Sequence, residues 1–440
     1  MKYYSTNKQA PVASLQEAVV KGLAADKGLF MPMSIKPLPQ DFYDTIDSLS
    51  FQEIAYRVAD AFFGEDIPAD TLKQIVYDTL SFDVPLVKVA DNIYSLELFH
   101  GPTLAFKDVG GRFMARLLGY FIKKEGQKNV NVLVATSGDT GSAVANGFLG
   151  VEGIHVYVLY PKGKVSEIQE KQFTTLGQNI TALEVDGTFD DCQALVKSAF
   201  MDKELNEHLS LTSANSINVA RFLPQAFYYF YAYAQLKRAG KADNAVICVP
   251  SGNFGNITAG LFGKKMGLPV KRFIAANNRN DIFYQYLQTG KYNPRPSVAT
   301  IANAMDVGDP SNFARVLDLY GGSHADISAE ISGTTYTDEQ IRETVKETWK
   351  EHRYLLDPHG ACGYRALVEG LKEGETGVFL ETAHPAKFLE TVESIIGEAV
   401  EIPAKLQEFM KGEKKSLQMT KDFADFKKYL LTLDRKSTRL

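Results

Sequence analysis

The sequence predicts an α/β protein with mainly parallel sheets, preceded by an N-terminal region that is mainly helical. Short, near-continuous apolar runs recur along the chain, as is typical of strands covered on both faces. We expect such strands at 131–136, 154–160, 180–185, 245–250, 270–276 and 377–382. Between them, apolar residues recur at helical spacing, as in Phe113, Leu117 and Phe121. This alternation of strands and helices is the pattern of parallel sheets joined by helical crossovers.

The two ends of the chain differ from this pattern. Residues 1–85 are richer in helical patterns and turns and contain no strongly buried strand, so we treat them as an N-terminal region packed on the rest. Residues 431–440 are expected to form a frayed tail, because 434–440 are basic and polar without apolar periodicity.

Composition and charge exclude several classes of protein. The chain has 440 residues, enough for about two to three domains, and 45% hydrophobic with 23% charged residues is ordinary for a globular protein. The net charge of −5 argues against nucleic acid or an anionic membrane as the main partner. The apolar stretch 222–236 contains Pro224 and two glutamines, which favours a buried helix over a membrane span.

The cysteines and the N-terminus indicate a reducing compartment. Cys192, Cys248 and Cys362 are far apart and lack the C-x-x-C spacing, so neither a disulfide framework nor a structural zinc site is expected. The N-terminus lacks the apolar core of a secretory signal. The seven histidines form no metal-binding pattern; His352 and His359, for example, have no acidic partner at ligand spacing. We therefore expect a soluble cytoplasmic protein without a catalytic metal.

The first candidate site is the junction 250–256, which reads Pro-Ser-Gly-Asn-Phe-Gly-Asn between an expected strand and an expected helix. In open α/β sheets, ligands bind beyond the carboxyl ends of strands. Glycines let the backbone approach an anion, and the N–H groups at the helix start then point at it, as a phosphate requires. The junction matches neither the Walker A pattern nor the G-x-G-x-x-G fingerprint. A tight turn with glycines for steric reasons is the alternative.

The second candidate site is the junction 136–142, Thr-Ser-Gly-Asp-Thr-Gly-Ser, which offers hydroxyl and N–H donors at a helix start. Such donors suit a carboxylate or a phosphate, and a capped helix start without a ligand is the alternative. Residues 139–142 also match the short aspartic-protease motif. That match is unconvincing, because those enzymes pair two such aspartates on a β-rich fold and this chain has one copy in an α/β setting.

Two further segments carry single residues of interest. Lys107 follows Leu-Ala-Phe and precedes Gly110 and Gly111 at the start of an expected helix. Apolar neighbours and a helix N-terminus disfavour a charged amine, and a neutral amine is a nucleophile that can form an imine. A lysine at a loop edge is the alternative. Thr382, at the end of the last strand, could bind a ligand or serve as a cap.

Taken together, these segments resemble one known family. The motifs are LFHGPTLAFKD (98–108), ATSGDTGSA (135–143), YPKGKVS (160–166), ANSINVAR (214–221), VPSGNFGN (249–256), NAMDVGDPSN (303–312) and TAHPAKF (382–388), with GLAADKGLFMP (22–32) near the N-terminus. They resemble the pyridoxal-phosphate enzymes of fold type II, and more closely the threonine synthases of the longer bacterial and fungal branch. The resemblance covers nearly the whole chain.

The resemblance implies a role for each matching position. Lys107 would hold pyridoxal 5′-phosphate as a Schiff base and move protons, Thr382 would bind the pyridine nitrogen, and Asp139 would lie near the 3′-oxygen. Shorter relatives commonly have Asn at that last position, and with Asp the hydrogen bond needs a shared proton. The residues that would cradle the cofactor phosphate are Gly252, Asn253, Phe254, Gly255 and Asn256. The residues that would bind substrate are Ser137, Gly138, Thr140, Asn215, Ser216 and Arg221.

The same resemblance implies a reaction and a domain plan. The reaction would be the conversion of O-phospho-L-homoserine and water into L-threonine and phosphate, the last step of threonine biosynthesis. The alternatives are another fold-type-II lyase, such as a threonine or serine dehydratase or a cysteine synthase, and a non-catalytic anion-binding relative. Residues 86–115 with 220–430 would form a large cofactor-binding α/β lobe, and 116–219 a smaller inserted one. The sequence leaves open whether the protein is a monomer or a homodimer.

Overall fold

The computed structural model describes residues 1–126 and 129–437, with side chains up to residue 433. The larger of two α/β lobes contains a six-stranded sheet in the order β12-β11-β10-β13-β5-β4. Its strands are β4 (Leu86–Ala90), β5 (Ile93–Glu97), β10 (Ala245–Pro250), β11 (Arg272–Asn277), β12 (Ile331–Thr335) and β13 (Thr376–Glu381). All neighbours run parallel except the β4–β5 hairpin at one edge.

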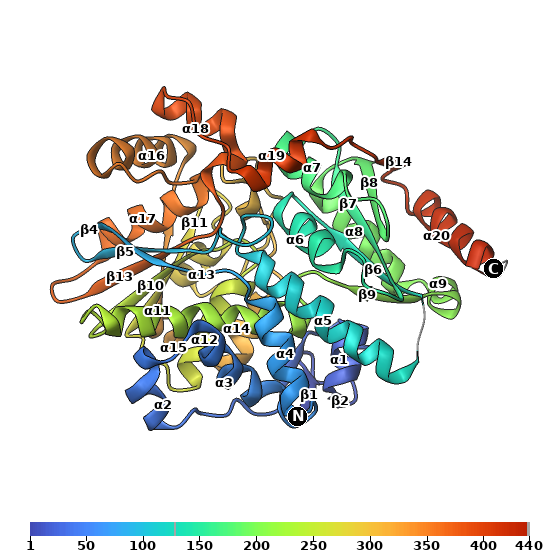
Figure 1. Cartoon of the computed structure of the whole chain (residues 1–440), viewed down its shortest axis with the longest axis horizontal. Helices are drawn as coiled ribbons and strands as arrows, with labels where there is room; N and C mark the ends of the chain where they lie inside the picture. Colours follow the sequence, from blue (N-terminus) through green and yellow to red (C-terminus); the bar gives the residue numbers. More distant parts are fainter. Residues whose placement is uncertain (127–128, 438–440) are drawn as a thin grey trace.

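The smaller lobe contains a five-stranded parallel sheet in the order β14-β8-β7-β6-β9. Its strands are β6 (Val130–Ala135), β7 (Ile154–Pro161), β8 (Ile180–Asp186), β9 (Ser210–Ser213) and β14 (Leu417–Thr420). Figure 1 shows this lobe beside the larger one, with the N-terminal elements packed along one side of the molecule. The arrangement confirms the predicted α/β class with parallel sheets.

Helices cover the sheets and connect their strands. In the smaller lobe they are α6 (Asp139–Phe148), α7 (Glu167–Thr174), α8 (Phe189–Met201) and α9 (Lys203–His208), and α20 (Phe423–Ser437) packs on α8 and α9. The remaining helices are α5 (Lys107–Glu125), α10 (Val219–Phe222), α11 (Ala226–Arg238), α12 (Gly255–Lys265), α13 (Ile282–Thr289), α14 (Phe313–Leu319), α15 (His324–Glu330), α16 (Asp338–His352), α17 (Pro358–Gly370), α18 (Leu389–Ile396) and α19 (Ala404–Lys411). Short 3₁₀ turns include η3 (Asn303–Met305) and η4 (Pro385–Phe388).

The N-terminal region combines helices with a small antiparallel sheet. It contains α1 (Leu15–Lys21), α2 (Gln40–Thr45), α3 (Phe51–Phe63) and α4 (Ala69–Thr79), and the strands β1 (Lys2–Ser5), β2 (Ala13–Ser14) and β3 (Phe30–Pro32). Ser50 begins α3 with a capping box, in which its hydroxyl accepts from the Glu53 amide and the Glu53 carboxylate accepts from the Ser50 amide. The region is mainly helical, as predicted.

All six strands expected from the apolar runs are present, shifted by one or two residues at most of their ends. The strands that the pattern missed lie largely at sheet edges or are short. In β12 and β14 only Ile331 and Met419 are buried, so neither strand has an apolar run to detect. Edge strands need bury little surface, which explains why hydrophobicity alone does not reveal them.

The C-terminal segment differs from the expected domain plan, although the other domain limits stay a prediction. β14 pairs in parallel with β8, so residues 417–420 extend the smaller sheet instead of belonging to the larger lobe. Helix α20 continues through Ser437, past the expected start of a frayed tail at residue 431, because Phe426 and Leu430 are buried on the smaller lobe. Residues 438–440 lie outside the described part of the chain.

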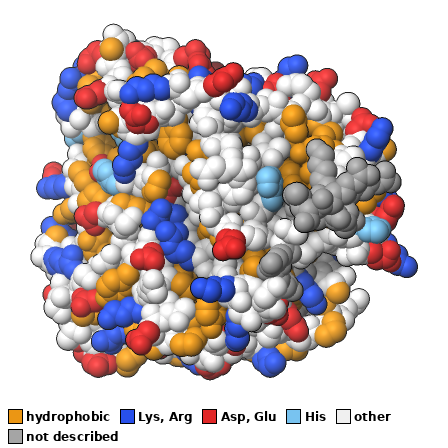
Figure 2. Space-filling view, turned by 45° about the vertical axis from the view of Figure 1, so that its right-hand side comes forward, with side chains coloured by type: hydrophobic (Ala, Val, Ile, Leu, Met, Phe, Trp, Pro, Cys, Tyr) orange, Lys and Arg blue, Asp and Glu red, His pale blue; other side chains and the backbone are white. Residues whose placement is uncertain are grey.

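The surface carries both signs of charge. On the face drawn in Figure 2, basic and acidic side chains are interspersed over the molecule. Across the described residues, no helix combines the length and the apolarity that crossing a bilayer requires.

Candidate active site

A cavity between the two lobes brings together most of the residues that the sequence singled out. Twelve of them line it: Lys107, Ser137, Thr140, Asn215, Ser216, Arg221, Gly252, Asn253, Phe254, Gly255, Asn256 and Thr382. The loops that follow β6, β10 and β13 supply many of these residues, because the carboxyl ends of parallel strands face the same way. Gly138 and Asp139 are not among the lining residues.

Lys107 is the first residue of α5 and its amine lies in this cavity. Burial lowers the pKa of the Lys107 amine to about 8; the Asp139 carboxylate opposes the shift, while nearby cations add to it. Its nitrogen lies 5.5 Å from the centre of the Phe106 ring. The Phe106 amide donates to the Thr382 carbonyl over 2.8 Å, so the start of α5 is fixed to the end of β13. The lysine is therefore held in place and is readily deprotonated.

The loop after β10 has the conformation expected of an anion-binding turn. Phe254 adopts φ +67° and leads directly into α12, whose first residues, Gly255 and Asn256, line the cavity. Gly252 has no room for a side chain, because a Cβ there would lie 2.7 Å from the Ala304 carbonyl oxygen. The Asn253 side chain accepts from the Ser311 amide (2.7 Å) and donates to the Ser216 hydroxyl (2.8 Å). The loop is thus rigid and tightly packed.

Two buried polar atoms in the cavity wall suit an anionic cofactor and substrate. Asn256 Nδ2 and Arg221 Nε are both buried without a hydrogen-bond partner among the described residues. Unpaired buried donors are unfavourable unless a ligand satisfies them. Asn256 Nδ2, the amides at the start of α12 and the amine of Lys107 form a donor set that fits the phosphate and the aldehyde of pyridoxal phosphate. Arg221 Nε remains as a donor for an anionic substrate.

Arg221 is a buried cation at this wall. The residue is 1% exposed, and its Nη1 donates to the Ala214 carbonyl. Burial lowers the pKa of Arg221 to about 10, so the group stays charged at neutral pH. The neighbouring Asn215 donates to the Ala135 carbonyl over 3.0 Å, which fixes this segment to the end of β6. A charged, positioned guanidinium is suited to binding a phosphate or a carboxylate.

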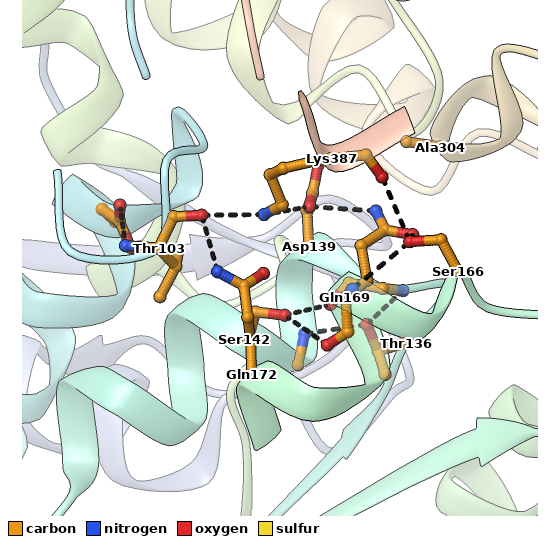
Figure 3. A network of polar contacts seen from close by, with 12 residues as sticks. Thr103, Thr136, Asp139, Ser142, Ser166, Gln169, Gln172, Ala304 and Lys387 are labelled. Atoms are coloured by element: carbon orange, nitrogen blue, oxygen red, sulfur yellow. Dashed lines mark hydrogen bonds and ion pairs between the residues drawn. The ribbon is translucent and has the colours of Figure 1, made fainter. Parts of the chain in front are cut away.

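Asp139 is buried and accepts from two side chains of other segments. Its Oδ1 accepts from Lys387 Nζ at 2.5 Å and from Gln169 Nε2 at 3.0 Å. Burial favours the protonated acid, but the cations of Lys387 and Lys107 outweigh this and lower the pKa of Asp139. Figure 3 shows the Lys387 side chain lying between Asp139 and the Thr103 carbonyl. Gly138 packs on Gln169, where a Cβ would lie 2.6 Å from the amide carbon.

Several lining residues escaped the sequence reasoning. They include Gln193, Asn303, Ala304 and His359. Asn303 and Ala304 lie within a motif quoted above for the resemblance, but no role followed from it. From the sequence alone, His359 was considered only as a metal ligand. In the structure, the His359 ring accepts from the Ala304 amide in the 303–307 loop, and the nearby Asp357 caps α17. Within the described residues, no cluster of His, Cys, Asp or Glu side chains is arranged to hold a metal ion.

Comparison with known proteins agrees with this geometry. Residues 84–382 match the family model of pyridoxal-phosphate dependent enzymes, and residues 2–80 and 360–430 match models of the threonine synthase N terminus and C-terminal region. Threonine synthase from Haemophilus influenzae is 46% identical, over 98% of this chain and 100% of that protein.

Two crystal structures extend the comparison. Threonine synthase from Escherichia coli superposes with a TM-score of 0.92 at 45% identity, over 98% of this chain and 100% of that one. A pyridoxal-phosphate-bound threonine synthase from Brucella melitensis gives 0.91 at 35% identity, over 99% and 100%. These matches confirm the predicted fold and the resemblance, and the chain belongs to the threonine synthase family of pyridoxal-phosphate-dependent enzymes.

Proposed function

We propose that this protein converts O-phospho-L-homoserine and water into L-threonine and inorganic phosphate. The observation that carries the proposal is the Lys107 amine, with a pKa lowered to about 8, in a cavity that also contains the α12 anion loop and the Arg221 guanidinium. A nucleophilic amine beside two anion-binding groups suits a cofactor phosphate and a phosphorylated substrate. We also propose a cytoplasmic location, supported by three buried free cysteines.

The proposed cofactor contacts are those that the family resemblance implies, and the cavity lining supports them for Lys107, residues 252–256 and Thr382. Lys107 would hold pyridoxal phosphate through its ε-nitrogen, the loop 252–256 would bind the phosphate, Thr382 would hydrogen-bond the pyridine nitrogen, and Asp139 would face the 3′-oxygen. When bound, pyridoxal phosphate accepts the electron pair left behind when the substrate loses its Cα proton. A neutral Thr at residue 382 does not force the pyridine nitrogen to carry a proton.

The protein's own groups then account for the remaining chemistry. With substrate in the cavity, the Lys107 amine would take the Cα proton and would exchange protons at the adjacent carbons, which lie within reach of one base. Arg221 and Thr140 would stabilise the charge of the departing phosphate. Ser137, Gly138, Asn215 and Ser216 would complete the substrate site. Closure of the two lobes would exclude bulk water until phosphate has left.

A product assay tests the reaction. The purified protein, loaded with pyridoxal phosphate and given phosphohomoserine, should release phosphate and threonine in equal amounts. Formation of a 2-ketoacid without threonine would instead identify a dehydratase.

A spectroscopic assay tests attachment of the cofactor. The loaded protein should be yellow, and borohydride reduction should leave a pyridoxyl adduct on the peptide that carries Lys107. A colourless protein without this adduct would indicate the non-catalytic alternative.

A further inference from the structure

Lys387 joins the two lobes immediately beside the proposed cofactor site. It lies in η4, five residues after Thr382, and its side chain is fully buried. Its ammonium donates to Asp139 Oδ1 (2.5 Å) in the smaller lobe and to the Thr103 carbonyl (2.8 Å) in the loop before Lys107. Its own carbonyl accepts from the Ser166 hydroxyl over 3.1 Å. One residue thus connects three segments that surround the cavity (Figure 3).

The Asp139 carboxylate has two cations within range but pairs with only one of them. Among the described residues, Lys387 makes an ion pair with Asp139, whereas no ion pair forms at Lys107. A buried carboxylate requires a counter-charge, because removing a charge from water is unfavourable unless a partner compensates it. If Lys387 were absent, the nearest remaining cation influencing Asp139 would be Lys107 itself.

We propose that Lys387 is a positioning residue that neutralises Asp139 and thereby keeps the Lys107 amine out of an ion pair. The inference rests on the proposed function, in which Lys107 must be neutral to react with the cofactor aldehyde. In that function the 3′-oxygen of the cofactor would lie near Asp139, and Lys387 would supply the positive charge that stabilises the Asp139 carboxylate there. The charged groups that influence the Lys107 amine are Asp139, Arg221 and Lys387.

The test measures the ionisation of Lys107 itself. The full-length chain, freed of cofactor, is trace-labelled with acetic anhydride over a range of pH, and mass spectrometry quantifies acetylation of the peptide that carries Lys107. Only the neutral amine reacts, so the pH dependence of labelling gives the pKa of that amine. The variants are Lys387→Met, Asp139→Asn and the double variant.

If Lys387 acts in this way, the two single variants should shift the pKa of Lys107 in opposite directions. Lys387→Met should raise the pKa of Lys107 above its value of about 8 by about one unit or more, because Asp139 then pairs with it. Asp139→Asn should lower the pKa of Lys107, because two cations remain without the carboxylate. The double variant removes both charges and should return to within about half a unit of the parent chain.

Lys405→Met is the matched control. Lys405 also donates to a carbonyl of the 99–106 segment, that of His100 at 3.0 Å, but it pairs with no carboxylate among the described residues. Its loss should leave the labelling curve of Lys107 unchanged. If Lys387→Met does not fold, the proposal is still tested by Asp139→Asn, which should lower the pKa of Lys107, and by the double variant, which should restore it.

Two outcomes would overturn the inference. One is a labelling curve for Lys387→Met that coincides with the parent curve. The other is a double variant whose curve stays displaced like that of Asp139→Asn, which would mean that Lys387 only holds the loop in place. Failure of the proposed function is seen separately, since the parent chain would then form no adduct with pyridoxal phosphate at Lys107.

Discussion

His359 Nε2 accepts a hydrogen bond of 3.0 Å from the backbone amide of Ala304, and this bond ties helix α17 to the loop that borders the cavity. Because Nε2 accepts, the proton sits on Nδ1, which lies 2.5 Å from Asp357 Oδ2. Burial acts against the charge of Asp357, but the neighbouring Glu381 carboxyl and His359 ring lower its pKa. For Glu381, burial and the charge of Asp357 raise the pKa well above the usual value.

Replacing His359 by Leu should loosen the 303–307 loop. The Ala304 amide would be left without its acceptor, which costs about 1–3 kcal/mol of unfolding free energy. Urea unfolding should show that loss, and titration with pyridoxal phosphate should show weaker binding. His352→Leu, at the exposed end of α16, is the control and should change neither quantity. Equal cofactor affinity in both variants would rule out a role for His359 in holding the loop.

Lys107→Ala should abolish both the yellow colour and turnover. The chain would lose the amine that attaches the cofactor and moves protons, so the rate should fall by at least about 10²–10⁴-fold. Absorption spectra and a threonine assay measure the two effects. Lys203→Ala removes an exposed lysine of α9 and should behave like the parent chain. A yellow, active Lys107→Ala protein would contradict the proposed role.

The cofactor-free chain should react with pyridoxal phosphate in a pH-dependent way. The folded-state pKa of Lys107 is lowered to about 8, so the amine is mainly charged below that pH and mainly neutral above it. The rate of chromophore formation should rise as pH increases through about 8 and then level off. A rate that keeps rising beyond pH 10, as for an ordinary lysine with a pKa of about 10.4, would refute the lowered value.

Arg221→Ala should impair use of the phosphorylated substrate while cofactor binding is retained. Removing one charged donor at a departing phosphate lowers kcat/KM by about 10²–10³-fold. Steady-state kinetics with phosphohomoserine and a cofactor titration separate the two properties. Arg221→Lys keeps the charge but lacks the two-pronged geometry, so its kcat/KM should fall between those of the parent and Arg221→Ala. An unchanged kcat/KM in Arg221→Ala would remove Arg221 from the site.

Gly252→Ala should weaken cofactor binding, because the added Cβ would lie 2.7 Å from the Ala304 carbonyl oxygen and 3.0 Å from Met305 Cα. Backbone atoms on both sides must move, which costs about 1–3 kcal/mol. The control is Gly119→Ala in α5, where a Cβ would make an ordinary 3.5 Å contact with Val151. Cofactor titration and thermal unfolding should distinguish the two. If both alanine variants bind cofactor equally well, the tight packing at Gly252 does not matter for the anion loop.

Local patterns predicted the parts of the fold that bury the most apolar surface. The six strands with near-continuous apolar runs are recognisable because a strand covered on both faces buries nearly all of its residues, as in β10, where all six are buried. β12 and β14 were missed because one buried residue each leaves no run to detect. The C-terminal helix α20 was also missed. Two apolar residues, Phe426 and Leu430, do not indicate a packed helix unless the surface of the smaller lobe that they contact is known.

The sequence by itself determined the α/β alternation, the polar junctions at strand ends and the lysine beside them, because hydrophobic period and turn chemistry are local properties. Only the tertiary structure decided which of these groups meet. That Asp139 is paired with Lys387 instead of Lys107, and that His359 supports Ala304, depends on how distant segments pack. Partner choice for a buried charge follows from burial and distance in three dimensions, and residue order along the chain does not encode either directly.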